Sequence, residues 1–302
     1  MTIPKKPGRR ARALCGVAAG LAIAGCGDST SAKPLVVPAF VVVGDTAGTA
    51  QLYRVEGGVI TRLSTTAGND VDPKSAAGRI VFSTDRDANY EVYIDITATV
   101  SRRVTNTVAQ DDHPALSPDG ATIVFVSNRS GTPRLWTVPA PALDATTFDA
   151  PTALVTGSDT AIPEGLPAWS PDGTTLAFNS TRGGTSQIYT MAAAGGTAVQ
   201  VTNEVGGAFD PAWSADGATI VYTSATGTLH LRQVKLSTST ASDFATDSLD
   251  LAAATCDANV CVAAEDPSGT RGSILAFPPK GGRGEVVIAR TRNEREPAIL
   301  VP

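Results

Sequence analysis

The sequence is poor in the residues that catalytic and nucleic-acid-binding proteins gather in their sites. It has only two histidines, and it lacks the Gly-x-Ser-x-Gly motif that exposes a nucleophilic serine in α/β-type hydrolases. Five of its 24 basic residues lie in the first 25 positions, where no acidic residue occurs. Without that segment the chain has ten more acidic than basic residues. No basic patch is left for a phosphate backbone, so we expect no nucleic-acid partner.

The apolar run near the N-terminus is short. Residues 13–25 are apolar, but a membrane-spanning helix needs ~20 such residues. Because basic residues precede this run, residues 1–25 are typical of an export signal peptide. The stretch from Leu21 to Cys26 resembles a bacterial lipobox, whose cysteine thiol receives the diacylglyceryl chains. The sequence therefore predicts a lipoprotein attached to the membrane through Cys26.

The segment after Cys26 is small and polar. Residues 26–37 begin Cys-Gly-Asp-Ser-Thr-Ser-Ala-Lys-Pro, a composition that predicts a flexible tether rather than a packed element. Gly27 stands where an inner-membrane retention aspartate would be, which favours the outer membrane in a Gram-negative host. We therefore expect an exported, monomeric cell-envelope lipoprotein, periplasmic or attached to the outer membrane.

Residues 38–302 lack long runs of leucine, glutamate and lysine, and the chain is rich in glycine (29) and proline (20). Such a composition favours short strands and many turns. A turn pattern, most clearly Pro-x-x-Ser-Pro-Asp-Gly, recurs and is each time followed by an apolar strand. It occurs in the segments Val71–Gly78, His113–Gly120, Leu166–Gly173 and Asp210–Gly217.

The spacing of these units predicts the number of blades and how the ring closes. The four prolines are 41, 53 and 44 residues apart, and Pro297 lies two units beyond the last of them, so a degenerate unit near residues 251–259 lies between. The longer third gap indicates an insertion around residues 141–160. Phe40–Val43 matches a second strand without a first, while residues 296–301 match a first strand without a second. We therefore predict an all-β fold: a six-bladed β-propeller of four-stranded antiparallel blades, closed by pairing of the C-terminal strand with the N-terminal blade.

These units resemble the WD40-like (PD40) repeats of the TolB family, whose consensus contains Pro-x-Trp-Ser-Pro-Asp-Gly. The resemblance covers residues 38–302 and is weakest at 249–293. It implies a propeller and, because such repeats also occur in propellers attached to serine peptidases, it specifies function poorly. TolB-like propellers generally present a face or a channel to a protein partner. The resemblance therefore implies a binding module.

The residue before each repeat proline is the main candidate for a site. These positions should form a ring near one mouth of the central channel, which could hold a cation or a basic group. Structural or solvated roles for the same side chains remain an alternative. The ring residues that could bind are Asp72, His113, Asp210 and Glu296, interrupted by Leu166 and Leu251.

Other recurring residues suggest structural roles. Arg86, Arg129 and Arg182 follow the second strands, where they should pack on the adjacent turn and bond carbonyls or the aspartate of a neighbouring Pro-Asp-Gly turn. Trp169 and Trp213 are expected in the core. Cys256 and Cys261 flank a hairpin turn and could form a disulfide in an oxidising compartment. One third-strand position should face outward; it is occupied by Gln51, Glu91, Arg134, Gln187 and His230.

These observations favour a non-catalytic, envelope-anchored module that binds a protein. No catalytic residue, metal site or cofactor is predicted. The alternative is a periplasmic propeller enzyme, a polysaccharide lyase or hydrolase, or a glycan or ligand sensor that uses the channel mouth.

Overall fold

The computed structural model describes residues 37–299 except for 47, 66, 98–99, 143–149, 155–156, 158–161, 246–250, 258–259, 266–273, 282–284 and 289–293. The expected signal peptide, Cys26 and all of the expected tether before Val37 lie outside the described residues, as does much of the 141–160 insertion. In the part of the chain that the structure describes, there is no helix with the length and apolar character needed to cross a membrane.

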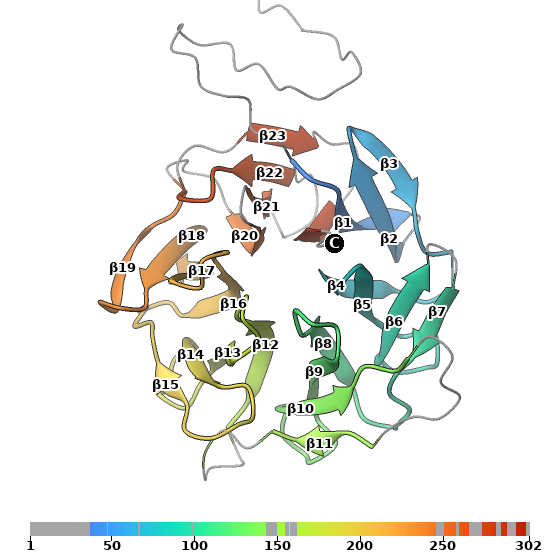
Figure 1. Cartoon of the computed structure of the whole chain (residues 1–302), viewed down its shortest axis with the longest axis horizontal. Helices are drawn as coiled ribbons and strands as arrows, with labels where there is room; N and C mark the ends of the chain where they lie inside the picture. Colours follow the sequence, from blue (N-terminus) through green and yellow to red (C-terminus); the bar gives the residue numbers. More distant parts are fainter. Residues whose placement is uncertain are drawn as a thin grey trace, which may run out of the picture.

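Six four-stranded antiparallel sheets stand radially around a central channel (Figure 1). The predicted all-β, six-bladed propeller is therefore confirmed. Blades 1 to 3 are β24 (Glu294–Ile299), β1 (Phe40–Thr46), β2 (Thr49–Glu56) and β3 (Val59–Arg62); β4 (Asp70–Ala76), β5 (Arg79–Thr84), β6 (Glu91–Thr97) and β7 (Val100–Arg103); and β8 (Asp111–Leu116), β9 (Thr122–Ser127), β10 (Arg134–Pro139) and β11 (Thr152–Ala153). Blades 4 to 6 are β12 (Glu164–Trp169), β13 (Thr175–Ser180), β14 (Gln187–Ala192) and β15 (Val199–Gln200); β16 (Ala208–Trp213), β17 (Thr219–Thr226), β18 (Thr228–Lys235) and β19 (Thr240–Asp243); and β20 (Leu251–Cys256), β21 (Cys261–Glu265), β22 (Ile274–Phe277) and β23 (Glu285–Ile288).

Blade 1 is assembled from both ends of the described chain. Strand β24 supplies its innermost strand and pairs antiparallel with β1, so that Phe40 lies opposite Ile299 and Val43 opposite Arg295. The predicted closure by the C-terminal strand is confirmed. Because β24 pairs with β1, the second strand of blade 1 is not left as an exposed edge.

The two faces of the ring differ in the segments that form them. We call turn face the side that carries the hairpins between first and second strands, such as 116–122, 169–175 and 213–219. We call connector face the opposite side, where segments such as 104–110 and 201–207 lead from one blade to the next. Since each first strand runs from the connector face to the turn face, sequence position along it reports depth in the channel.

Every first strand contains a bulge, and in five of the six it lies at the repeat proline. In β4 the register shifts between Val71 and Lys74, which leaves Asp72 and Pro73 unpaired. Equivalent shifts occur in the other five first strands. The residue before the proline takes a left-handed backbone at Asp72, His113, Leu166 and Asp210, with φ between 47° and 53°. Non-glycine residues adopt this conformation at a cost, so the surrounding sheet must impose it.

The bulge corrects one expectation about the ring. In β20 the register shifts between Ala252 and Thr255, which places Ala253, and not Leu251, at the pre-proline position of blade 6. Leu251 pairs with Glu265 at the start of the strand instead. The sixth repeat has no proline to mark the bulge, which is why alignment by sequence missed it by two residues.

The Ser-x-Asp-Gly hairpins are fixed by their own side chains. The hydroxyl of Ser117 donates to Asp119, and the same carboxylate accepts the amide N–H of Ala121 at 3.0 Å. Blades 4 and 5 repeat this arrangement at Asp172 and Asp216. The serine hydroxyl lowers the pKa of each of these three exposed carboxyls. The glycine that follows has φ near 70°, which other residues adopt only with strain.

Tryptophans join neighbouring blades. The indole N–H of Trp169 donates to the carbonyl of Ala115 at 3.0 Å, and that of Trp213 donates to Ala168 at 3.1 Å. Trp213 is buried, whereas Trp169 is half-buried and packs against the apolar cluster that includes Leu135 and Phe178. Each indole therefore acts between a first strand and the first strand of the preceding blade.

Replacing Trp169 by phenylalanine should lower the free energy of unfolding by about 1 kcal/mol, because it removes one inter-blade hydrogen bond and leaves the Ala115 carbonyl without that donor. Urea denaturation followed by circular dichroism measures the change. Trp136→Phe is the control, since its indole bonds no neighbouring blade in the described structure. A loss at Trp136 as large as that at Trp169 would contradict the proposed role of the bond.

Candidate functional site

The recurring arginines are used within their own blades. Arg129 pairs with Asp111, the first residue of β8, at 2.7 Å, and its guanidinium lies over the rings of Phe125 and Trp136. Arg86 with Asp70 and Arg182 with Glu164 repeat this arrangement. The structural role expected for these arginines is therefore present, but their partner is the buried acid of the first strand rather than a Pro-Asp-Gly aspartate. Each of these buried ion pairs links the beginning of the first strand to the turn between the second and third strands of the same blade.

The third-strand position expected to face outward is buried in four of its five occurrences. Gln51 and Glu91 have no exposed surface, Gln187 is 4% exposed and Arg134 is 7% exposed. Only His230 is partly exposed, and its ring contacts the Thr228 hydroxyl at 2.8 Å. The expectation was wrong because these side chains fold back onto the connector that leads to the next blade, where backbone groups need partners.

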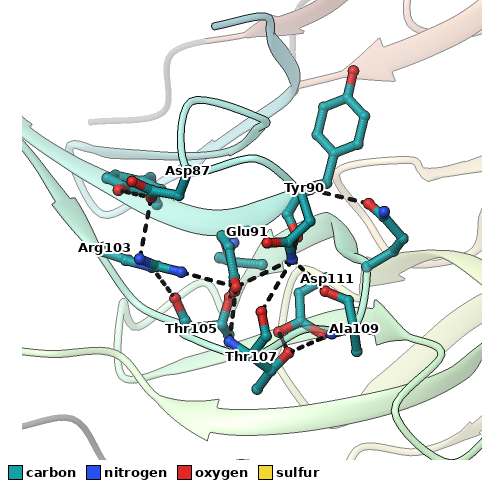
Figure 2. Close-up of polar contacts among 12 residues, drawn as sticks. Asp87, Tyr90, Glu91, Arg103, Thr105, Thr107, Ala109 and Asp111 are labelled. Carbon is teal, nitrogen blue, oxygen red and sulfur yellow. Dashed lines mark hydrogen bonds and ion pairs between the residues drawn. The ribbon is translucent and has the colours of Figure 1, made fainter.

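Glu91 shows how this works (Figure 2). Its carboxylate accepts bonds from the guanidinium of Arg103 at 2.9 Å and the amide of Thr107 at 2.7 Å, and it also accepts the Thr105 hydroxyl. Thr107 in turn donates to Asp111, which begins the next blade. In the same way Gln187 exchanges two backbone bonds with Glu204. These polar clusters bind third strands to the connectors that lead to the next blade. The Glu91 carboxylate is bonded within the fold in this way.

The channel contains polar side chains that those clusters do not include. The imidazole of His113 lies 3.6 Å from a carboxylate oxygen of Asp72 and 2.9 Å from one of Asp112, and the His113 amide donates to Asp72 at 3.3 Å. His113 is 38% exposed, so solvent reaches it along the channel. The structure thus brings together two members of the expected ring from adjacent blades, Asp72 and His113.

Asp210, the third member of the ring, lies within electrostatic range of the first two. Burial inside the channel raises its pKa, and the neighbouring Asp72 adds to this effect, while Lys74, His113 and a bond from Thr223 oppose it. Glu296 occupies the equivalent backbone position in β24, but its side chain lies outside the described part of the structure. The described residues contain no group of three His, Cys, Asp or Glu side chains arranged to hold a metal ion.

The raised pKa of Asp210 predicts a pH dependence of stability. A carboxyl whose pKa is higher in the folded state contributes most below its ordinary value of 3.8, and this contribution is lost as the pH rises through the raised pKa. Asp210→Asn should therefore gain stability relative to the parent as the pH increases above about 4. Urea denaturation at several pH values measures this difference, with His113→Gln in both proteins to remove the imidazole titration. A difference that is constant with pH would contradict the expectation.

An apolar cavity of about 330 Å³ lies at the turn-face ends of the first strands. Prolines, alanines and the residues at the ends of the first strands line it, and Lys74 lies at its inner end, where it acts electrostatically on Asp210. Cys256, which is bonded to Cys261 across the β20–β21 hairpin, forms part of the wall. The side chains at the strand ends that line the cavity are Ala76, Leu116, Trp169, Trp213 and Cys256.

The architecture and the channel place the protein in a class. Six four-stranded blades, a repeated Ser-x-Asp-Gly hairpin and a channel lined by bulged first strands define a six-bladed β-propeller. The family model described as "TolB beta propeller domain" (PD40) matches residues 156–298. Residues 156–298 therefore resemble this family in sequence, and the structure has the six-bladed propeller that the repeat pattern predicted.

Solved structures show the same fold. TolB from Acinetobacter baumannii is 19% identical and superposes with a TM-score of 0.72, over 88% of this chain and 67% of that one. A putative TolB from Agrobacterium tumefaciens is 15% identical with a TM-score of 0.65, over 86% of this chain and 91% of that one. An oligogalacturonate lyase in complex with manganese is 15% identical with a TM-score of 0.57, over 83% of this chain and 74% of that one. No curated protein matches the chain in sequence.

Proposed function

We propose that this chain is a non-catalytic β-propeller, anchored to the cell envelope through a lipid on Cys26, that binds a protein partner. The observation that carries the proposal is how its polar residues are used. The arginines after the second strands and the buried third-strand residues are bound into the fold itself. The surfaces of the propeller that remain for other molecules are its two faces and the channel between them. Likeness to TolB structures supports the same role.

Within this function the channel ring is the proposed contact site. Asp72 and His113 are in contact across two adjacent blades, and both act electrostatically on the carboxyl of Asp210. Glu296 occupies the same backbone position in β24. Because three carboxylates, those of Asp72, Asp112 and Asp210, lie near a single lysine, Lys74, a basic side chain of the partner would be favoured there. The ring is offered as part of the binding role and not as a metal centre.

The test is capture of a partner from detergent-solubilised envelope by the lipidated protein, followed by a binding titration with the purified partner. The double variant Asp210→Asn/Glu296→Gln should weaken the measured affinity at least tenfold. Glu56→Gln is the matched control, because it neutralises an exposed carboxylate on β2 that pairs only with Arg54 in the described structure. Unchanged binding by the double variant would rule out the ring as the contact.

An enzyme remains the second candidate, because Asp72, His113 and Asp210 lie together in the channel. A likeness to a lyase whose structure contains manganese favours a lyase or hydrolase acting on polysaccharide over other enzymes. The same side chains could instead serve a glycan or ligand sensor. Recovery of no protein partner, together with a tightly bound metal in elemental analysis of the purified protein, would overturn the binding role in favour of this alternative.

A further inference from the structure

The chain enters the propeller on the turn face. Strand β1 begins at Phe40, which pairs with Ile299 at the end of β24. In blades 2 to 5 the corresponding strand ends are joined by the turn-face hairpins. Val37 packs against the apolar cluster that contains Phe40 and Val260. Val37, the first described residue of the chain, therefore lies on the same side of the propeller as the apolar cavity.

The segment between Cys26 and Val37 is short. Eleven peptide steps separate the two residues, which span ~36–40 Å at full extension. A random-coil segment of this length and composition would have a root-mean-square length of only ~17–20 Å. A lipid on Cys26 would thus hold Val37 close to the bilayer surface.

The opposite orientation would use almost the whole of this length. To place the connector face toward the lipid, the segment must pass outward over β2 and β3, which takes ~10 Å at the usual strand spacing. It must then cross the depth of the blade, which for a six-residue strand is ~20 Å. Little length would remain to reach the membrane, and a nearly extended chain loses most of its conformational freedom.

We propose that the turn face of the propeller lies against the lipid surface and the connector face points away from it. The proposal rests on the lipidation of Cys26 inferred above. In this orientation a protein partner reaches the propeller from the connector face. The apolar cavity opens toward the lipid, whereas the channel ring is approached from the connector face. That face also carries Val108 and Val205, the two most exposed large hydrophobic side chains in the described structure, at 102% and 91% exposure.

Matched fluorescent probes in two blades test the orientation. Ala121→Cys and Ala218→Cys place a label on the turn face of blades 3 and 5, and Val108→Cys and Val205→Cys place it on the connector face of the same blades. Each lipidated full-length variant is labelled without reduction, so that the Cys256–Cys261 bond stays closed, and is reconstituted in phosphatidylethanolamine–phosphatidylglycerol vesicles. Lipids with a nitroxide on the headgroup then quench nearby labels.

The turn-face labels should be quenched at least threefold more than the connector-face labels, and inserting about 20 Gly/Ser residues after Thr30 should remove most of that difference. Equal quenching with the natural tether, or stronger quenching on the connector face, would overturn the orientation while leaving the anchor intact. Intact-mass measurement separates the two proposals. A protein without acyl chains on Cys26 would overturn the anchor itself, and the orientation with it.

Discussion

Replacing Glu164 by alanine is expected to lower the free energy of unfolding by about 3–5 kcal/mol, the range for breaking a buried ion pair. The Glu164 carboxylate has no exposed surface, and it bonds two guanidiniums, Arg182 at 2.5 Å and Arg134 at 3.1 Å. Both arginines are largely covered by protein, so each would lose its charged partner without gaining full access to water. Urea denaturation of the isolated protein measures the loss.

Two comparisons show whether the loss comes from the ion pairs. Glu56→Gln breaks an exposed pair with Arg54 and should cost no more than about 1 kcal/mol. Glu164→Ala combined with Arg134→Met and Arg182→Met should be less destabilised than the sum of the three single changes, since the charges then disappear together. Strictly additive losses would mean that Glu164 acts through packing alone.

The acidic partner of each recurring arginine can be predicted from the sequence, because it precedes the arginine at a nearly constant spacing. Asp70, Asp111 and Glu164 each precede their arginine by 16 to 18 residues. In blade 5 the first strand begins with Ala208 instead, and the tight hairpin after β17 contains no arginine. Within blades 2 to 5, this joint presence or absence of an acid and an arginine is the available signal. The aspartates of the Ser-x-Asp-Gly hairpins are not the partners, because their carboxylates are already bonded to serine.

The strands and the closure of the ring follow from local patterns, whereas the buried third-strand residues do not. Alternation along β6 cannot show that Glu91 turns back to the connector, since its partners Arg103, Thr105 and Thr107 lie 12 to 16 residues further on. Likewise, the left-handed backbone at His113 comes from the bulge and is not a preference of histidine itself. That backbone sets the direction of the imidazole and brings it to Asp72 of the preceding blade.

Deleting residues 294–302 should abolish the cooperative unfolding transition. The deletion removes β24, the innermost strand of blade 1, and uncovers β1. The side chains of Phe40, Val41, Val42 and Val43 are at most 1% exposed, and losing even half of their burial would remove ~3–6 kcal/mol. That is a large part of the ~5–15 kcal/mol that stabilises a typical domain. Size-exclusion chromatography and thermal unfolding should show aggregated or molten protein.

A circular rearrangement separates loss of the strand from damage to the chain. Residues 294–299 can be moved in front of Phe40 and joined to it by Ser-Pro-Asp-Gly-Thr-Thr, the sequence of residues 170–175 that joins the paired residues Trp169 and Leu176 in blade 4. Because Ile299 already lies opposite Phe40, this connection needs no change in register. The rearranged protein should recover a cooperative transition, although it carries the same C-terminal deletion. If it stays unfolded while the parent folds, the C-terminal residues act through something other than strand pairing with β1, and closure of the ring would not explain their role.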